Sequence, residues 1–335
     1  MSVEMREIPL SEWESHCPDE VSSVFHTSQA LRTVEKSASY DLRILCGFKG
    51  DEPIGMLPVF VRDIMFVKVI ASPPPGMSLP WMGPLLFTNS PKRRKQEKTN
   101  REFTDKVLEA VNADKQTTLI RLICTPEYFD ARPYEWEGLT VNPRYTYRLD
   151  LNDRTEDEVL MSFSSDVRSE IREGSDLDIQ LNVRGPDAAG KIYDAYNQRI
   201  EELGSTLPTS RQFTSEFMEA LGDRARAYVA ETPDGEFVGG ITVLYSNDTA
   251  FSWQGGMRAN YEGVSVNSLL DWRIIEDILT EPSLDSIDWY DFGNANDERL
   301  SWYKAKYNPQ LVPHYEVLSG QAISVIKTVY NKVVI

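Results

Sequence analysis

The feature that most constrains the fold of this chain is a weak internal repeat. Residues 42–71 and 226–255 each contain an apolar segment, a Gly-Asp or Asp-Gly turn, a second apolar segment, a polar break and a third apolar segment. A shift of 184 residues places Gly55 on Gly239. Apolar runs separated by such turns are typical of antiparallel hairpins. The sequence therefore predicts two copies of one antiparallel meander.

The segments that flank the two meanders also correspond. A short amphipathic pattern precedes each copy, and a longer helical pattern followed by an apolar run comes after it. These segments are 27–36, 92–113 and 118–124 in the first copy and 214–221, 267–280 and 287–292 in the second. We predict an α+β fold with two domains, residues 1–150 and 151–335. Each domain has a mixed, mainly antiparallel sheet flanked by helices.

Three further elements are expected outside the repeats. Residues 155–173 and 188–203 have helical patterns, with a short strand at 179–183 between them. The amphipathic segment 322–334 is a candidate for a final helix on the body of the protein.

Composition limits the class of partner. Among 335 residues, 35 Lys and Arg stand against 52 Asp and Glu, which gives a formal charge of −17. DNA is therefore a poor partner for this chain. The basic residues comprise 13 lysines and 22 arginines. A dispersed acidic surface with few lysines suits a halophilic cytosol, and an acidic mesophilic protein is the alternative hypothesis.

Several classes of site and location are not expected. The sequence has no apolar run of the roughly 20 residues that span a bilayer and no secretory signal, so we expect no transmembrane segment and a cytoplasmic location. Cys17, Cys46 and Cys124 form no CxxC pair and are expected to be reduced and mostly buried. Three scattered histidines favour neither a metal site nor histidine catalysis.

Two motifs in the last third of the chain carry a family resemblance. The WYDFG segment at 289–293 and the WYKAKY segment at 302–307 resemble the D-[FL]-G strand end and the following [FY]-K-x-x-[FY] element of FemAB-like proteins. Glu12-Trp13, residues 25–28 and the proline-rich stretch 72–84 are similar to the first domain of that family. FemAB-like proteins contain two GNAT-like domains and include transferases that attach amino acids to peptidoglycan precursors.

The resemblance implies both a fold and a function. It implies two tandem GNAT-like domains, the second of which carries the D-F-G and Y-K-x-x-Y elements. It also implies an acyl or aminoacyl transferase that forms an amide on an amine of a cell-envelope or glycoconjugate precursor. The acceptor would be a small molecule or a lipid-linked glycan or peptide. No cofactor or metal would be bound, and acyl-CoA or aminoacyl-tRNA would be the co-substrate, with tRNA a partner in the second case.

Two other functions fit the same fold. One is an acyl-CoA-dependent N-acyltransferase in polysaccharide or small-molecule synthesis. The other is a non-catalytic module that only holds a glycan or peptide.

Three residues are catalytic candidates. By the resemblance, Lys304 lies close to the reacting carbonyl, where a cation stabilises the tetrahedral oxyanion. Tyr303 stands where GNAT enzymes often carry a tyrosine that protonates the leaving group, but it could equally pack the core with Trp302 and Tyr307. Asp291 ends a predicted strand, where it could accept the proton of the amine or form the turn before Gly293.

Seven residues are candidates for substrate binding. Asn260 and Gly263 give a partial match to the GNAT pyrophosphate loop, Glu262 would oppose phosphate there, and Asn267 opens the next helix. The remaining candidates are Trp253, Arg258, Arg168 and Arg172.

These four have alternative roles as well. Trp253 and Arg258 lie near the end of a central strand, where they would face a cleft or serve as ordinary sheet residues. Arg168 and Arg172 share one helix face and would hold an anion or pair with nearby acids. The basic run 92–95 is interpreted as a solvated helix start, and an aminoacyl-tRNA donor would give it a use.

Overall fold

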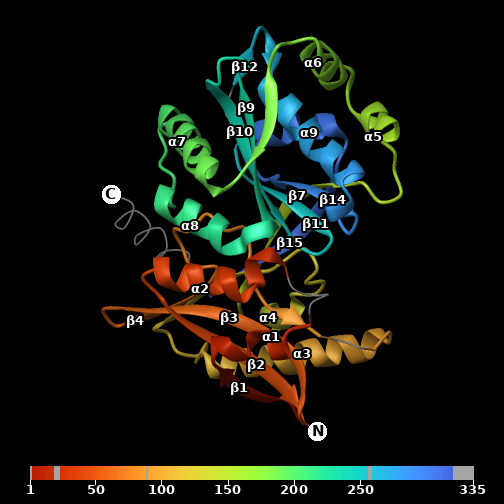
Figure 1. Cartoon of the computed structure of the whole chain (residues 1–335). Helices are drawn as coiled ribbons and strands as arrows, with labels where there is room; N and C mark the ends of the chain where they lie inside the picture. Colours follow the sequence, from red (N-terminus) through yellow and green to blue (C-terminus); the bar gives the residue numbers. More distant parts are fainter. Residues whose placement is uncertain (1, 19–22, 88–89, 256–258, 320–335) are drawn as a thin grey trace. The chain divides into compact units, whose positions relative to one another are not determined.

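The computed structural model describes residues 2–18, 23–87, 90–255 and 259–319 (Figure 1). The chain forms two compact units. Unit 1 contains the residues up to Arg144 together with the segment from Pro313 onward, and unit 2 contains Tyr145–Val312.

The sheet of unit 1 contains the first predicted meander. Its strands pair in the order β1-β2-β3-β4-β6-β15, and β5 pairs with β3. All of these pairings are antiparallel except β4 with β6, which is parallel. The strands are β1 (Glu4–Ile8), β2 (Asp41–Lys49), β3 (Glu52–Ile64), β4 (Val67–Ser72), β5 (Leu85–Leu86), β6 (Thr118–Ile123) and β15 (Gln310–Leu318).

A capping residue and two glycines determine where helices of unit 1 begin and how closely they pack. The helices are α1 (Trp13–His16), α2 (Ser28–Ser37), α3 (Arg93–Ala110) and α4 (Arg132–Trp136), with 3₁₀ turns at Leu10–Glu12 and Val24–His26. Thr27 caps α2 by accepting a 3.2 Å bond from the Ala30 amide. The Phe103 ring of α3 lies so close to Gly47 and Gly55 that a Cβ at either position would be within 3.0 Å of it. Glycine at these two positions therefore lets α3 pack against β2 and β3.

The sheet of unit 2 repeats the same order of pairings. Its strands pair as β8-β9-β10-β11-β14-β7, antiparallel except for β11 with β14. The two predicted meanders, β2-β3-β4 and β9-β10-β11, are confirmed. The strands are β7 (Thr140–Asp150), β8 (Gln180–Arg184), β9 (Ala225–Glu231), β10 (Phe237–Tyr245), β11 (Thr249–Gln254) and β14 (Trp289–Asn294), with a separate hairpin of β12 (Asn260–Tyr261) and β13 (Val264–Ser265).

Helices cover both faces of the unit 2 sheet (Figure 1). A Cβ on Gly240 would meet Ile192 of α7, whereas one on Gly239 would meet Val266 and Leu270 of α9. Neighbouring strand residues face opposite sides, so α7 and α9 lie on opposite faces. The helices are α5 (Glu156–Ser162), α6 (Ser165–Ser175), α7 (Pro186–Glu202), α8 (Arg211–Leu221), α9 (Val266–Thr280) and α10 (Glu298–Lys304), with 3₁₀ turns at Gly222–Arg224, Pro282–Leu284 and Ala305–Tyr307.

The prediction of one helix over residues 155–173 is wrong. Phe163 and Ser164 are extended and separate α5 from α6. The buried Phe163 ring packs 5.9 Å from the Trp272 ring and 5.2 Å from the Tyr307 ring, centroid to centroid. The Ser164 amide donates a 2.8 Å bond to the Lys306 carbonyl. Tertiary packing and this backbone bond therefore replace the helical bonds that the sequence pattern favoured.

The two units divide the chain near the predicted boundary. Unit 2 begins at Tyr145, close to residue 150, whereas the described residues 313–319, which were expected in the second domain, group with unit 1. The end of β15 pairs with β6 in unit 1, with Glu316 opposite Ile123. The α+β class is confirmed. All three cysteines are free and buried, and the predicted helix at 322–334 lies outside the described residues.

Candidate active site

The carboxyl end of β14 brings the main candidate residues together. The parallel ladder between β11 and β14 ends at Phe251 and Asp291, although β14 continues to Asn294. Lys304 Nζ donates a 2.9 Å hydrogen bond to the Asn294 carbonyl oxygen. The ammonium group therefore lies at the end of β14, beyond the point where its pairing with β11 stops.

Short-range bonds in α10 direct Lys304 to this place. Asp297 caps the helix by accepting a 2.9 Å bond from the Leu300 amide. The Ser301 hydroxyl donates a 2.9 Å bond to the Ala295 carbonyl. Lys304 is the last residue of α10 and is half-buried. The helix is thereby held against the segment that follows β14, and the lysine is placed against the strand end.

The charge of Lys304 responds to its surroundings. Burial lowers the pKa of this lysine to about 8, while the carboxylates of Asp291, Asp271 and Asp297 favour its charged form. At neutral pH, Lys304 is therefore an ammonium ion in most molecules. It loses its proton as the pH rises about one unit above neutral.

Asp291 is fully buried, and both of its carboxylate oxygens accept hydrogen bonds. It accepts bonds from the Thr146 hydroxyl, from Arg148 Nε at 3.0 Å and from the Gly293 amide at 2.7 Å. Burial raises the pKa of this carboxyl, and the charge of Arg148 opposes the rise. The bond to the amide two residues ahead is that of a turn-forming aspartate. This geometry supports the turn-forming role of Asp291 over that of a free base.

A second buried carboxylate was not singled out by the sequence. Asp271 of α9 is 4% exposed. The Tyr290 hydroxyl donates to its Oδ1 at 2.8 Å, and the Tyr303 hydroxyl lies 3.5 Å from its Oδ2. The Tyr303 and Tyr307 hydroxyls are 3.0 Å apart, and Tyr307 lies 3.4 Å from the Ser268 hydroxyl. We call these five residues the Asp271 cluster.

Burial controls the protonation of this cluster. It raises the pKa of Asp271 to about 6, against the tyrosine hydroxyls and the charge of Lys304, which favour the carboxylate. Burial also raises the pKa of the hydroxyls of Tyr290, Tyr303 and Tyr307. The tyrosines are therefore neutral hydrogen-bond donors near neutral pH. The pKa values of Asp271 and Lys304 thus lie on either side of pH 7.

Arg168 and Arg172 of α6 form the predicted anion site. Two of the three acids expected to pair with Arg168 and Arg172 are engaged elsewhere. Asp166 binds Lys306, and Glu170 accepts a 2.5 Å bond from the Ser268 hydroxyl. Arg168 contacts the Met161 sulfur at 3.5 Å, and Arg172 is exposed. The two arginines remain candidates for an acceptor anion.

The predicted phosphate loop contains a tight β-hairpin. Asn260 pairs with Ser265 across β12 and β13, and the turn residues Glu262 and Gly263 have φ values of 50° and 93°. The Val266 amide, which opens α9, donates a 3.1 Å bond to the Ala259 carbonyl. At least one amide at the helix start is thus engaged within the chain. Arg258 lies outside the described residues.

Two other candidates near this hairpin can be located. Asn267 is a half-buried residue in the first turn of α9. The Trp253 ring lies 6.3 Å from the Phe213 ring and 5.2 Å from the Phe217 ring, centroid to centroid. Trp253 therefore packs against α8, and this contact supports its role as an ordinary residue of the sheet.

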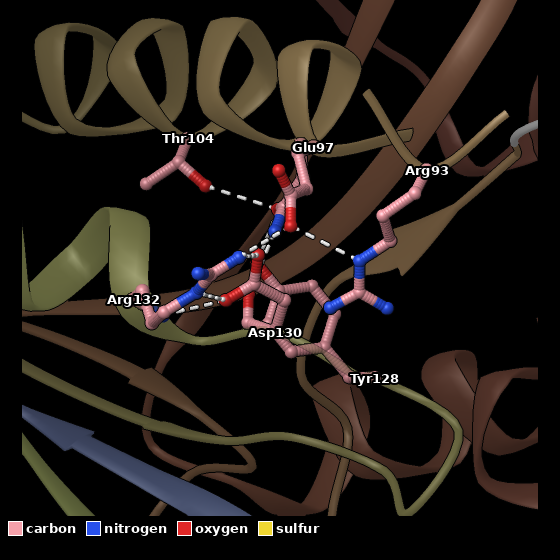
Figure 2. Close-up of polar contacts among 7 residues, drawn as sticks. Arg93, Glu97, Thr104, Tyr128, Asp130 and Arg132 are labelled. Carbon is pink, nitrogen blue, oxygen red and sulfur yellow. Dashed lines mark hydrogen bonds and ion pairs between the residues drawn. The ribbon is translucent and has the colours of Figure 1, made fainter. Parts of the chain in front are cut away.

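The basic run at the start of α3 contributes to a polar cluster in unit 1 (Figure 2). Arg93 donates to Glu97 at 3.0 Å, and Arg132 donates to the same oxygen at 2.7 Å. Arg132 also forms two bonds, of 2.7 and 2.9 Å, with the buried carboxylate of Asp130. We call Arg93, Glu97, Asn100, Thr104, Tyr128, Asp130 and Arg132 the Asp130 cluster. Lys92, Arg94 and Lys95 are exposed.

In residues 2–18, 23–87, 90–255 and 259–319, no group of three or more His, Cys, Asp or Glu side chains is placed to hold a metal ion. Over the same ranges, every helix is too short or too polar to cross a membrane.

Sequence reasoning missed Asp271, Ser268 and Arg148. The signal for Asp271 was an acidic residue on the buried face of α9, next to Leu270 and one turn before Ile275. An aspartate at such a position requires hydrogen-bond partners. Those partners come from β14, α10 and the 3₁₀ turn after it, so periodicity in α9 alone could not identify them.

Residues 161–307 match the family model of the acetyltransferase (GNAT) domain. The matched segment includes β9 to β14 and ends at Tyr307 of the Asp271 cluster. No curated protein sequence matches the chain.

Solved structures match nearly the whole chain. FemX aligns with a TM-score of 0.71 and 11% identity, over 96% of this chain and 99% of that one. L-PGS from Bacillus licheniformis aligns with a TM-score of 0.55 and 12% identity, over 97% and 95%. A tandem GNAT protein from the clavulanic acid biosynthesis pathway gives 0.54 and 11%, over 95% and 98%. These matches confirm the GNAT fold that the resemblance to FemAB-like proteins implied.

Proposed function

We propose that this chain consists of two tandem GNAT-like domains and is an acyltransferase. It transfers an aminoacyl or acyl group to an amine of a cell-envelope or glycoconjugate precursor in the cytoplasm. The repeated strand order, the matched GNAT segment and the likeness to FemX support the fold. The observation that carries the function is the half-buried Lys304 ammonium at the end of β14.

The chemistry requires a positive charge near the carbonyl. The amine nitrogen attacks the carbonyl carbon of the activated donor, and the carbonyl electron pair moves onto oxygen. The tetrahedral intermediate then expels the alkoxide or thiolate, which takes up the proton that the amine loses. A cation close to the oxyanion lowers this barrier, and a single donor contributes about 3 kcal/mol. We assign this role to Lys304, which would be the catalytic residue.

The hairpin favours an aminoacyl ester as donor. In a GNAT pyrophosphate loop, free backbone amides and a helix N-terminus bind phosphate. Here the Val266 amide is engaged with Ala259, and Glu262 is exposed at the turn. The exposed cations Lys92, Arg94 and Lys95 would suit a tRNA backbone. Acyl-CoA remains the second donor to be tested.

A binding-only role is the competing function. In that case a Lys304 side chain directed into bulk solvent would be expected. Its bond to Asn294 and its lowered pKa of about 8 oppose this alternative.

A donor assay tests the proposal. Purified protein is incubated at low and at high salt with acyl-CoA or charged tRNA and candidate amines, and loss of the thioester or ester is followed. We expect amine-dependent loss of one donor, and Lys304→Met should slow it about 100-fold or more, because one oxyanion donor contributes that much.

Lys306→Met is the matched control. Lys306 lies two residues further on and binds Asp166, and the side chains of this pair are 41% and 51% exposed. Its replacement should change the rate less than about threefold, since an exposed ion pair contributes little. If both donors stayed intact with every amine, or if Lys304→Met were as active as the control, the proposed function would be refuted.

A further inference from the structure

A series of hydroxyl groups links two carboxylates that belong to different helices. At one end, the Tyr303 hydroxyl lies 3.5 Å from Oδ2 of Asp271 in α9. The Tyr303 and Tyr307 hydroxyls are 3.0 Å apart, and Tyr307 lies 3.4 Å from the Ser268 hydroxyl. At the other end, Ser268 donates a 2.5 Å bond to Oε2 of Glu170 in α6. We call these five residues the hydroxyl series.

The middle of the hydroxyl series is shielded from bulk water. Ser268 and Tyr307 are fully buried, and Asp271 is 4% exposed. Tyr303 and Glu170 are half-buried. Buried hydroxyls find their hydrogen-bond partners inside the protein. The hydrogens that fill the inner bonds of the series therefore come from its own members.

The series has too few hydrogens when both carboxylates are ionised. Each tyrosine or serine hydroxyl carries one hydrogen, and an ionised carboxylate only accepts. Three hydroxyls thus supply three hydrogens, whereas joining all members from end to end needs four hydrogen bonds. A single proton on either carboxyl supplies the fourth. Every hydroxyl then donates in the same direction, away from the protonated end.

Two further observations agree with a missing hydrogen. The Tyr303–Asp271 and Tyr307–Ser268 distances of 3.5 and 3.4 Å exceed the usual 2.5–3.0 Å of an O–H···O bond. Tyr290 donates its own hydrogen to Oδ1 of Asp271 at 2.8 Å and so does not supply the series. Burial raises the pKa of Asp271 to about 6. This carboxyl therefore holds a proton more tightly than a solvated aspartate does.

We propose that the hydroxyl series is a proton path, in which Asp271 and Glu170 share one proton and pass it between them. As the proton leaves Asp271, Tyr303 takes it up and gives its own hydrogen to Tyr307. Tyr307 gives its hydrogen to Ser268, and Ser268 gives its hydrogen to Glu170. At each hydroxyl oxygen one O–H bond breaks as another forms. The Asp271 carboxyl becomes a carboxylate, the Glu170 carboxylate becomes a carboxyl, and no further reactant takes part.

The use of this path in catalysis rests on the proposed function. An acceptor amine with a pKa of about 10 is an ammonium ion at neutral pH. Forming an amide from it releases one proton in addition to the alcohol or thiol. Tyr303 is half-buried and directly precedes Lys304 in α10, so the proton enters at this end of the path. It leaves from the half-buried Glu170, which releases it to water.

Other titratable groups act on the ends of the path. Lys304 and the hydroxyl of Tyr290 both favour the carboxylate form of Asp271. Burial raises the pKa of Tyr290, Tyr303 and Tyr307, so each phenol keeps its hydrogen near neutral pH, as the hydrogen count requires. On the side of α6, Arg168 and Arg172 share the helix with Glu170.

A titration of Asp271 tests the shared proton. Its pKa is followed by carbon-13 NMR of the side-chain carboxyl in wild type and in Ser268→Ala. Without the Ser268 hydroxyl, two hydrogens remain for the two bonds that join Asp271, Tyr303 and Tyr307. No hydrogen is then missing, and the Asp271 pKa should fall by about one unit or more toward the ordinary value of about 3.9. A purely electrostatic role predicts no fall, because both carboxylates are still present.

A second variant approaches the path from its other end. In Glu170→Gln the side-chain amide donates to Ser268 and supplies the missing hydrogen without opening a space. The Asp271 pKa should again fall. Ser268→Thr keeps the hydroxyl and should restore the wild-type pKa. Ser162→Ala is the matched control, since it removes a serine hydroxyl of α5 that donates to the Val159 carbonyl at 2.6 Å, and it should leave the pKa unchanged.

The acyl-transfer rate of the same variants keeps the path separate from the proposed function. Ser268→Ala should lower the rate at least about tenfold, and Ser268→Thr should recover it, because positioned proton transfer contributes about 10²–10⁴. The predicted titration in a protein that consumes no donor supports the path, and only the proposed function fails. An Asp271 pKa that stays at its wild-type value in both Ser268→Ala and Glu170→Gln overturns the path, and any transfer activity then leaves the proposed function standing.

Discussion

Asp130 in unit 1 and Asp271 in unit 2 are both buried aspartates surrounded by hydrogen-bond donors, but their donors differ in charge. Asp130 accepts two bonds from the Arg132 guanidinium, at 2.7 and 2.9 Å (Figure 2). Asp271 accepts from tyrosine hydroxyls. Burial favours the neutral acid at both sites. At Asp130 the bonds and charge of Arg132 outweigh it and lower the pKa, whereas at Asp271 burial prevails and raises the pKa to about 6.

This difference separates a structural site from a reactive one. In the Asp130 cluster, Arg93 and Arg132 share Glu97, and Asn100 is held between Tyr128 and the Asp130 carbonyl. An arginine keeps its proton at any physiological pH, so this cluster has one charge state. Lys304, which follows Tyr303 of the Asp271 cluster in the sequence, has a pKa of about 8. Groups that titrate near the working pH are the ones suited to catalysis.

The largest expected effect that tests this comparison is the pH dependence of stability. The pKa of Asp271 rises from about 3.9 in the unfolded chain to about 6 in the folded one, so the folded state binds the proton more tightly. Its contribution should fall by roughly 2–3 kcal/mol as pH rises from 4 to 7. Urea unfolding of wild type and Asp271→Asn across this range measures the difference.

Asp130 should show the opposite slope. Because its pKa is lowered in the folded state, it stabilises the protein above about pH 4, and this contribution is lost as pH falls below that value. Asp130→Asn should therefore lose stability relative to wild type near pH 6 and approach it near pH 3. Slopes of the same sign for the two variants would remove the distinction between the clusters.

A smaller effect comes from matched tyrosine substitutions. Tyr290 donates to the Asp271 carboxylate at 2.8 Å, and Tyr128 donates to the amide oxygen of Asn100 at 2.7 Å. Tyr128→Phe should cost about 1 kcal/mol at every pH, as for a neutral hydrogen bond. Tyr290→Phe should cost more at pH 8 than at pH 4, because its acceptor is ionised only at the higher pH. Equal, pH-independent costs would contradict a titrating Asp271.

Much of the fold could be predicted because the turns and apolar runs that define it are local sequence patterns. These turns and runs predicted β2-β3-β4 and β9-β10-β11, and the repeat predicted two similar sheets. The break between α5 and α6 could not be predicted, since Phe163 packs on Trp272 and Tyr307, which are far away in the sequence. The return of β15 to β6 likewise depends on a pairing that no local pattern reveals.

The candidate site was predictable in part. The resemblance pointed to Lys304, and the structure places it beside the end of β14, where its role stays a proposal. Asp271 was not found, because the helical pattern of α9 shows only that it is buried. Its partners come from three other elements, and only the folded chain assembles them.

The most direct test of the account replaces Lys304 at the end of β14 and Arg132 of the Asp130 cluster, and measures both rate and stability. Lys304→Met should lower the acyl-transfer rate about 100-fold or more, with an unfolding midpoint in urea close to that of wild type. Arg132→Met should lower the unfolding midpoint and leave the transfer rate of the folded protein within about threefold of wild type, because Arg132 pairs with Asp130 and Glu97 of unit 1 and has no assigned role in transfer. The account is contradicted if Lys304→Met loses stability but not activity, or if the two variants lose activity to the same extent.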